Sequence, residues 1–180
     1  MKELSLNILD IAENSIKAGA TLTEIILNET DDILEITIKD NGCGMDEETL
    51  KNVVDPFYTT RTTRKVGLGL PLLKLAAEQS EGSFQIESSI DEKGHGTVVK
   101  ALFNKKHIDF TPLGDVISSI TTLIQGHPEC DFLFSHNLPK GEIKLDTREI
   151  RQILEDVPLN SYEVIKWIEE YLKEQYSEIA

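Results

Sequence analysis

The sequence predicts an α/β fold, and two patterns of apolar residues predict it. From Leu4 to Ile16, apolar residues recur at helical spacing and stop before Gly19, a residue type that commonly follows the last turn of a helix. Residues 33–39 instead alternate apolar and polar side chains, which is typical of a strand with one buried face. Helical and strand patterns then succeed one another along the chain, so we expect helices packed against a sheet.

Turn signals divide the rest of the first half into further elements, and we assign residues 1–104 to one domain. Asp46 is suited to cap a short helix, because its side chain can accept a backbone hydrogen bond in the first turn. Pro71 falls in the first turn of a later helix, where a missing N–H costs little. After the first helix we expect strands at 21–28, 33–39, 83–89 and 96–103, and helices at 46–54 and 69–79.

The pattern changes after Asn104, and we interpret residues 105–180 as an αββαα extension. Its role does not follow from its residues, and one hypothesis is that it docks a partner protein. Asp146 and Asn160 each precede a Glu by three positions, which is the spacing of a helix-capping box. We expect helices at 114–125, 147–155 and 161–176 and strands at 130–136 and 141–146.

Composition excludes several classes of protein. The net charge of −14 over 180 residues argues against general binding to nucleic acid or to anionic membranes, because phosphates would be repelled. No apolar run approaches the roughly 18 residues that span a bilayer, and the N-terminus lacks the apolar stretch of a signal peptide, so we expect a cytoplasmic protein. Two cysteines, Cys43 and Cys130, predict neither a metal site nor a disulfide framework.

One face of the first helix carries polar residues suited to a nucleotide. Asp10, Asn14 and Lys17 are spaced i, i+4 and i+7, so they share a helical face. The amide oxygen of Asn14 suits a Mg²⁺ ion that keeps several waters and takes its other ligands from phosphates. Lys17 can reach a phosphate as a point charge. Glu13 points about 100° away from Asn14 and is interpreted as a salt-bridging or capping partner.

Three further segments follow in the same domain. The segment "DNGCGM", residues 40–45, places a carboxylate at a strand end, followed by glycines that let a ligand approach the backbone. Taken alone, Asp40 is equally suited to an Asx turn. The segment "DPFYTT", residues 55–60, precedes a loop rich in Thr and Arg, and "GLGL", residues 67–70, closes that loop at the start of a helix.

Taken together, the four segments resemble the N, G1, F and G2 boxes of the GHKL ATP-binding superfamily, which includes gyrase, Hsp90, MutL and histidine-kinase ATPase domains. The form PFYTT…GLGL is most similar to the histidine-kinase branch. The resemblance covers roughly residues 3–103, and Gly96-Thr97 fits the final glycine-threonine of the family. It implies a two-layer α/β sandwich of the Bergerat type, with a mixed sheet and helices on one face.

The resemblance also implies ATP and Mg²⁺ as cofactors and a role for each residue. Asp40 would accept the adenine amino group, and Thr97 would support it through water. Gly42 and Gly44 would admit the adenine, and Met45 would pack on it. Asn14 would ligate Mg²⁺, and a lid over residues 59–66 would close on the triphosphate. The other residues expected to contact nucleotide are Lys17, Phe57, Thr59, Thr60, Arg61, Arg64, Lys65, Gly67, Leu68, Gly69 and Leu70. Which of the three lid cations contacts phosphate stays open.

Asp10 departs from the family pattern. Hydrolysing members carry Glu at this position as a general base, whereas histidine kinases usually carry Asn. Asp keeps the charge but is shorter by one methylene, roughly 1.5 Å, and a base must come within about 3 Å of its water. We predict a catalytic role for Asp10, either in slow hydrolysis or in holding a water of the Mg²⁺ ion.

These observations predict an ATP- and Mg²⁺-binding regulatory protein, either a stand-alone protein kinase or an ATPase-type switch. The alternative is a nucleotide-dependent interaction module with no significant turnover. Because the first box begins almost at Met1, we expect no preceding phosphoacceptor domain, and the extension is predicted to cover surface left bare there or to dock a partner. Besides ATP, the expected partner is an unidentified protein or phosphoacceptor, with a homodimer as a further candidate state.

Overall fold

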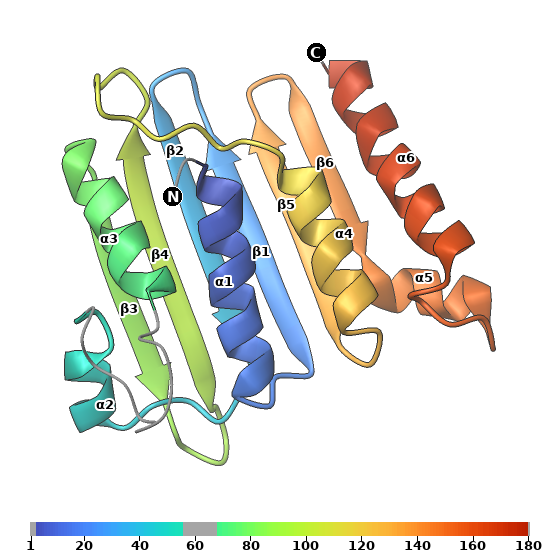
Figure 1. Cartoon of the computed structure of the whole chain (residues 1–180), viewed down its shortest axis with the longest axis horizontal. Coiled ribbons are helices and arrows are strands. Elements are labelled where there is room, and N and C mark those ends of the chain that lie inside the picture. The colour runs from blue at the N-terminus through green and yellow to red at the C-terminus, as the bar shows by residue number, and fades with distance from the viewer. Residues whose placement is uncertain (1–2, 56–67, 180) are drawn as a thin grey trace.

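The computed structural model describes residues 3–55 and 68–179, and they form a single six-stranded sheet with helices packed on it (Figure 1). The strand order is β3-β4-β2-β1-β5-β6, with one parallel pair, β1 and β5. The predicted fold, a mixed sheet in a two-layer α/β sandwich, is confirmed. The elements are α1 (Leu4–Lys17), β1 (Leu22–Glu29), β2 (Ile33–Asp40), α2 (Glu47–Asn52), α3 (Gly69–Gln79), β3 (Ser83–Ser89), β4 (Gly96–Asn104), α4 (Val116–Gly126), β5 (Asp131–Leu138), β6 (Gly141–Asp146), α5 (Thr147–Leu154) and α6 (Tyr162–Ile179).

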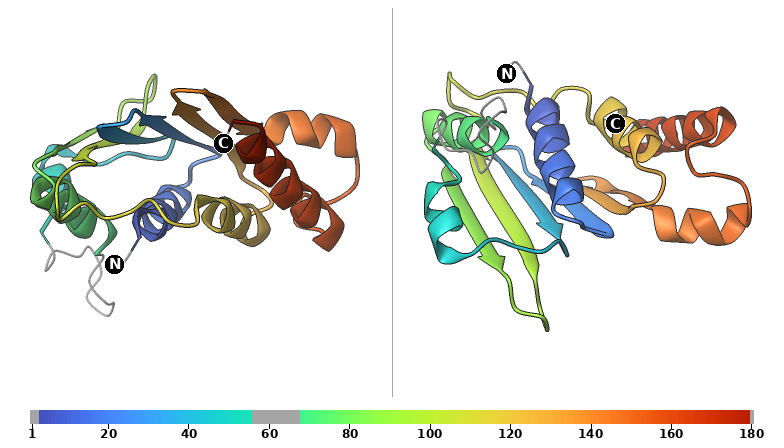
Figure 2. Two further views of the ribbon diagram at one scale, coloured as in Figure 1. Left: turned by 90° about the horizontal axis from the view of Figure 1, so that it is seen from above. Right: turned by 60° about the horizontal axis from the view of Figure 1, so that its bottom comes forward.

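Alternation along the central strands creates the layered core. In β1 and β2, every second side chain is buried, including Ile25, Leu27 and Ile36, and these residues form the face that α1 covers. The helix contributes Leu4 and Ile8 from its inner stripe, and both are fully buried. Burying one such side chain contributes about 1.5–3 kcal/mol, so the packing of α1 on the central strands helps to stabilise the first domain. The views from above and from below show α1, α3 and α4 on the same side of the sheet (Figure 2).

Strand register brings one end of β2 against the start of β4. The two strands are antiparallel neighbours, and Asp40 lies opposite Thr97. The same end of the sheet receives the C-terminus of α1, which ends before Gly19 in the left-handed conformation, at φ 82°. The end of α1, the end of β2 and the start of β4 therefore meet at one end of the sheet.

The extension continues the same sheet. Strand β5 pairs in parallel with β1, and β6 pairs antiparallel with β5, so the predicted boundary at residue 104 falls on the last residue of β4. The division into a domain of residues 1–104 and an extension of residues 105–180 stays a prediction.

The linker, residues 105–115 between β4 and α4, also completes the start of α1. No side chain caps this helix at Glu3, but the amides of Leu4 and Ser5 donate to the carbonyls of Pro112 and Leu113 at 2.9 and 2.8 Å. These linker carbonyls satisfy two of the four N–H groups that a helix leaves unpaired at its N-terminus.

A buried polar network holds the extension to the first domain. His136 on β5 is 2% exposed, and its Nε2 lies 2.7 Å from a carboxylate oxygen of Glu29 on β1. The other carboxylate oxygen of Glu29 lies 2.7 Å from Nζ of Lys105. The hydroxyl of Tyr176 on α6 lies 2.7 Å from Nδ1 of His136. Burial, reinforced by the charge of Glu29, raises the pKa of Tyr176, so this phenol remains protonated and can donate to the imidazole.

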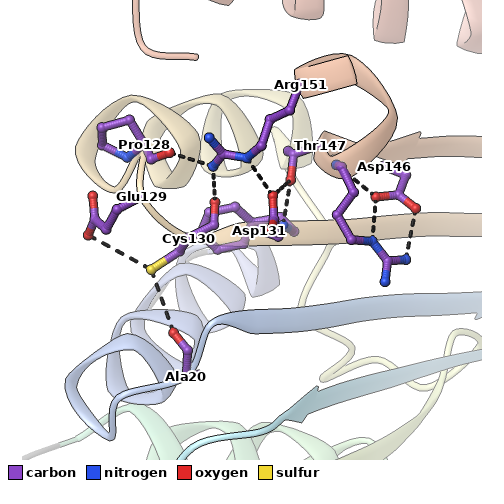
Figure 3. Close-up of polar contacts among 10 residues, drawn as sticks. Ala20, Pro128, Glu129, Cys130, Asp131, Asp146, Thr147 and Arg151 are labelled. Carbon is purple, nitrogen blue, oxygen red and sulfur yellow. Dashed lines mark hydrogen bonds and ion pairs between the residues drawn. The ribbon is translucent and has the colours of Figure 1, made fainter. Parts of the chain in front are cut away.

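A second cluster anchors α5 to the start of β5 (Figure 3). The guanidinium of Arg151 donates to a carboxylate oxygen of Asp131 at 2.7 Å and to the carbonyls of Pro128 and Cys130. Thr147 donates to the same oxygen of Asp131 at 2.9 Å. Its own hydroxyl oxygen accepts the amide of Phe132 at 2.9 Å. The cluster fixes the turn from β6 into α5.

Candidate functional site

The carboxylate of Asp40 is the centre of the candidate site. Its Oδ1 accepts the amide of Gly42 at 2.9 Å and the amide of Thr97 at 3.3 Å. Its Oδ2 accepts the hydroxyl of the buried Ser15 on α1 at 2.7 Å. A carboxylate has about four lone-pair positions, so the donors among residues 3–55 and 68–179 leave one position on Oδ2 open. Asp40 can therefore form an Asx turn and still accept a hydrogen bond from a ligand, so its two predicted roles are compatible.

The glycine turn after Asp40 lies tightly against α1 and β3. A Cβ on Gly42 would lie 3.0 Å from both the Cβ and the carbonyl oxygen of Ala18. Gly44 has φ 76°, and a Cβ there would lie 1.9 Å from the carbonyl oxygen of Ser89. Gly44 therefore requires glycine, both for close approach and for its backbone conformation, whereas a side chain at Gly42 would be tight against Ala18.

Two residues outside the predicted set hold this turn in place. The Nδ1–H of His95 donates to the carbonyl of Gly42, with the two atoms 2.6 Å apart. The hydroxyl of Ser88 accepts the amide of Met45 at 2.8 Å and lies 2.8 Å from the hydroxyl of Thr97. These hydrogen bonds join the turn at residues 42–45 to the β3–β4 hairpin. His95 stands between Gly94 and Gly96, and only the folded chain shows that its ring reaches this turn.

The predicted polar face of α1 is present. Asp10, Asn14 and Lys17 are all exposed. Partial burial raises the pKa of Asp10 above its ordinary value of 3.8; the charge of Lys17 opposes this shift and that of Glu13 adds to it. Ser15, the next residue after Asn14, is buried and bonds Asp40 directly, whereas the side chain of Asn14, about 100° round the helix, is exposed.

The start of α3 lies against the middle of α1. A Cβ on Gly69 would lie 3.2 Å from the Cβ of Asp10, so these two predicted site residues are neighbours. Leu68 occupies the N-cap position of α3 without a side-chain hydrogen bond, and the first turn carries no acidic residue. The first backbone amides of α3 thus form the positive end of this helix, beside the polar face of α1. This arrangement favours the binding of an anion. Leu70 is buried in the core behind it.

Part of the predicted site lies outside the described residues. These positions are the F-box and lid residues Phe57, Thr59, Thr60, Arg61, Arg64 and Lys65, together with Gly67. Their roles remain predictions.

Glu13 forms the contact that we interpreted for it. Nε2 of His127, in the loop between α4 and β5, lies 3.0 Å from both carboxylate oxygens of Glu13. The extension therefore contacts α1 one residue before Asn14.

A different hollow lies at the junction of α5 and α6. It has a volume of about 410 Å³ and is lined by Pro128, Glu129, Arg151 and residues 155–160. None of the described residues of the predicted nucleotide site lines it. Arg151 already donates to Asp131 and two carbonyls, and the other charged residues lining it are acidic. We therefore interpret it as the packing hollow of a helix junction.

No helix within residues 3–55 and 68–179 is long and apolar enough to cross a membrane. The same ranges contain no group of three His, Cys, Asp or Glu residues that could hold a metal ion. A magnesium ion bound mainly by phosphates, water and one amide oxygen would not require such a group.

The sequence matches relatives among bacterial signalling proteins. The chain is 34% identical over 106 residues to a putative sensor protein of Shewanella frigidimarina, covering 57% of this chain and 16% of that protein. It is 37% identical over 98 residues to sporulation kinase E of Bacillus subtilis, covering 54% of this chain and 13% of that protein. The chain thus spans less than a fifth of either relative.

Structural likeness extends further along the chain. The MutL ATPase domain of Aquifex aeolicus, solved in complex with ADP, superposes with a TM-score of 0.55 at 18% identity, over 86% of this chain and 70% of that one. At this identity the likeness shows the fold alone. Its coverage exceeds what the first domain can supply, so part of the extension shares the fold as well.

The family comparison covers the segment that holds all the site residues described above. Residues 2–107 match the model described as "Histidine kinase-, DNA gyrase B-, and HSP90-like ATPase". The match spans more than half of the chain and ends shortly after β4, where the extension begins. The chain therefore belongs to the family of histidine kinase-, DNA gyrase B- and HSP90-like ATPases.

Proposed function

We propose that the chain binds ATP with Mg²⁺ at the end of the sheet where α1, the end of β2 and the start of β4 meet. We propose further that it acts as an ATP-dependent regulator of another protein. The observation that carries the proposal is the coordination of Asp40. Three donors of the chain fix its carboxylate, and one lone pair on Oδ2 is left for the exocyclic amino group of a purine.

The residues present fit a nucleotide and its metal. The two glycines let the turn at residues 42–44 pack closely on Ala18 and Ser89, which holds this turn beside Asp40. Asn14 offers an amide oxygen to Mg²⁺, Lys17 offers a charge to phosphate, and the uncapped start of α3 offers backbone amides. Mg²⁺, when bound, supplies charge neutralisation of the phosphates.

Asp10 is the residue we propose for catalysis. It lies beside the N-terminus of α3, where the phosphates would bind, and its raised pKa makes it a better proton acceptor than an ordinary aspartate. The two forms of the proposal are a protein kinase and an ATPase-type switch, acting on an unidentified partner. The alternative function is an interaction module in which nucleotide binding changes partner affinity and turnover is incidental.

Calorimetry tests nucleotide binding. We expect wild-type protein to bind ATP in magnesium buffer and Asp40→Asn to bind at least about tenfold more weakly, a loss of about 1.4 kcal/mol. The amide nitrogen of Asn would face the donors that now point at the carboxylate. Asp46→Asn is the matched control: Asp46 caps α2 at 2.8 Å from the Thr49 amide, and Asn caps equally well. Equal affinity of wild type and Asp40→Asn would contradict the proposed site.

Single-turnover incubation with γ-labelled ATP separates the enzyme from the module. Label transferred to a protein, or phosphate released faster by wild type than by Asp10→Asn, favours the kinase or the ATPase. Tight ATP binding with the same absent turnover in both proteins favours the interaction module. Homodimer formation and cytoplasmic location remain predictions, which sedimentation and fractionation test.

A further inference from the structure

The outward face of α6 carries two aromatic rings that the fold leaves exposed. Val164, Ile168 and Leu172 form the buried stripe of this helix. Trp167 and Tyr171, on another side of the helix, are 49% and 38% exposed. Their rings stack on each other, with centroids 5.1 Å apart and planes inclined by 8°. Helix α6 lies at the end of the molecule opposite α3 (Figure 1), so this pair is remote from the nucleotide site.

Three carboxylates accompany the aromatic pair. Glu163, Glu170 and Glu174 are exposed and lie four residues before, three after and seven after Trp167, which places them on the same side of the helix. We call these five residues the α6 face. In the part of the chain that the structure describes, no cation forms an ion pair with any of the three carboxylates. Lys173 is paired with Glu169, four residues before it, and the charge of Glu170 acts on it more weakly.

Charge decides which occupant fits this surface. A second copy of the chain would bring three unpaired carboxylates against three more, in a protein whose net charge is already −14. A cationic occupant would instead neutralise them. The guanidinium of arginine is planar, is more weakly hydrated than an ammonium group, and stacks on aromatic rings while donating to carboxylates. Arginine therefore fits both parts of the surface better than lysine.

We infer that the α6 face docks a basic, arginine-bearing segment of another protein. The inference deepens the proposed function, on which it rests, by naming the surface and the chemistry of the regulated partner. Docking is measured without nucleotide and ATP binding without peptide, so the failure of one is distinguishable from the failure of the other.

The experiment uses the full chain and the fluorescence of Trp167, which is its single tryptophan. Two synthetic amphipathic helical peptides of equal length share the same leucines; one carries arginine and the other glutamate at every polar position. We expect the arginine peptide to change the emission of Trp167 saturably, with an affinity that falls as ionic strength rises. The glutamate peptide should leave the emission unchanged.

Two matched variants separate local docking from general attraction. Glu170→Lys with Glu174→Lys reverses two charges of the α6 face, whereas Asp91→Lys with Glu92→Lys makes the same change of net charge at the exposed β3–β4 turn. We expect the first pair to weaken arginine-peptide binding about tenfold, and the second pair to weaken it much less. Tyr171→Ala should weaken it about threefold through the lost ring, as measured by anisotropy of labelled peptide.

Three results of the peptide experiments would overturn the inference. They are equal weakening by the two double variants, equal binding of the arginine and glutamate peptides, and no binding of the arginine peptide at low ionic strength. Concentration-dependent dimerisation that Tyr171→Ala abolishes would also overturn it, because the occupant would then be a second copy.

Discussion

Replacing Glu29 by Gln tests how the extension is held to the first domain. The carboxylate of Glu29 lies 2.7 Å from both His136 and Lys105, and its side chain is 18% exposed. The hydrogen bond from His136, foremost, and the contact with Lys105 lower the pKa of Glu29 from 4.5 to about 2, against the opposing effect of burial. This shift corresponds to at most about 3.4 kcal/mol. Screening by solvent reduces it, and we expect Glu29→Gln to lose about 1–2 kcal/mol at neutral pH.

The pH dependence of this loss identifies its cause. Because the folded-state pKa is depressed, the contribution of ionised Glu29 is complete above about pH 4.5 and is lost as the pH falls from there towards 2. Urea unfolding of wild type and Glu29→Gln should therefore show a gap at pH 7 that narrows between pH 4.5 and 3.

A matched control uses Glu142→Gln on the neighbouring strand β6, where the side chain is exposed. We expect this variant to stay within about 0.5 kcal/mol of wild type at every pH. The reasoning fails if Glu29→Gln unfolds like wild type at pH 7, or if its gap stays constant as the pH falls.

Three further predictions concern the site and its supports. Gly44→Ala should lose at least about 3 kcal/mol in urea unfolding, because its Cβ would lie 1.9 Å from the carbonyl oxygen of Ser89; Gly94→Ala, whose Cβ would meet nothing within 4 Å, should lose less than about 1 kcal/mol. Asp10→Asn should be at least as stable as wild type in nucleotide-free thermal unfolding at pH 7, because the raised pKa shows that the ionised carboxylate is disfavoured in the fold; a clear fall in Tm would contradict this. Ser119→Ala should cost about 0.5–1.5 kcal/mol by removing its 2.9 Å hydrogen bond to the carbonyl of Ser5, and an unchanged urea midpoint would show that water replaces it.

Local pattern predicted the elements because local interactions form them. Helix α2 follows its cap, Asp46, whose side chain accepts the amide of Thr49 as expected. Helix α1 ends where Gly19 takes a positive φ, and β2 covers the alternating segment that predicted it. The order and residue types of the four boxes likewise predicted the family, because a short motif keeps its residues together in sequence.

The supports of the candidate site could not be predicted in this way. Ser88 and His95 reach the turn at residues 42–45 from the β3–β4 hairpin, and no spacing along the chain relates them to that turn. Ser15 was within the first box, but only the packing of α1 against the end of β2 gives its hydroxyl a partner in Asp40.

The sequence by itself therefore determined the helices, the strands and the family, since each depends on residues within a few turns or on a compact motif. Tertiary structure alone decided that β5 pairs in parallel with β1, which makes the extension part of the same sheet. It also decided that Glu29 meets His136 and that Glu13 meets His127. The physical reason is that such pairs form between residues more than a hundred positions apart, where the whole packed core, and not the neighbouring sequence, sets the distance.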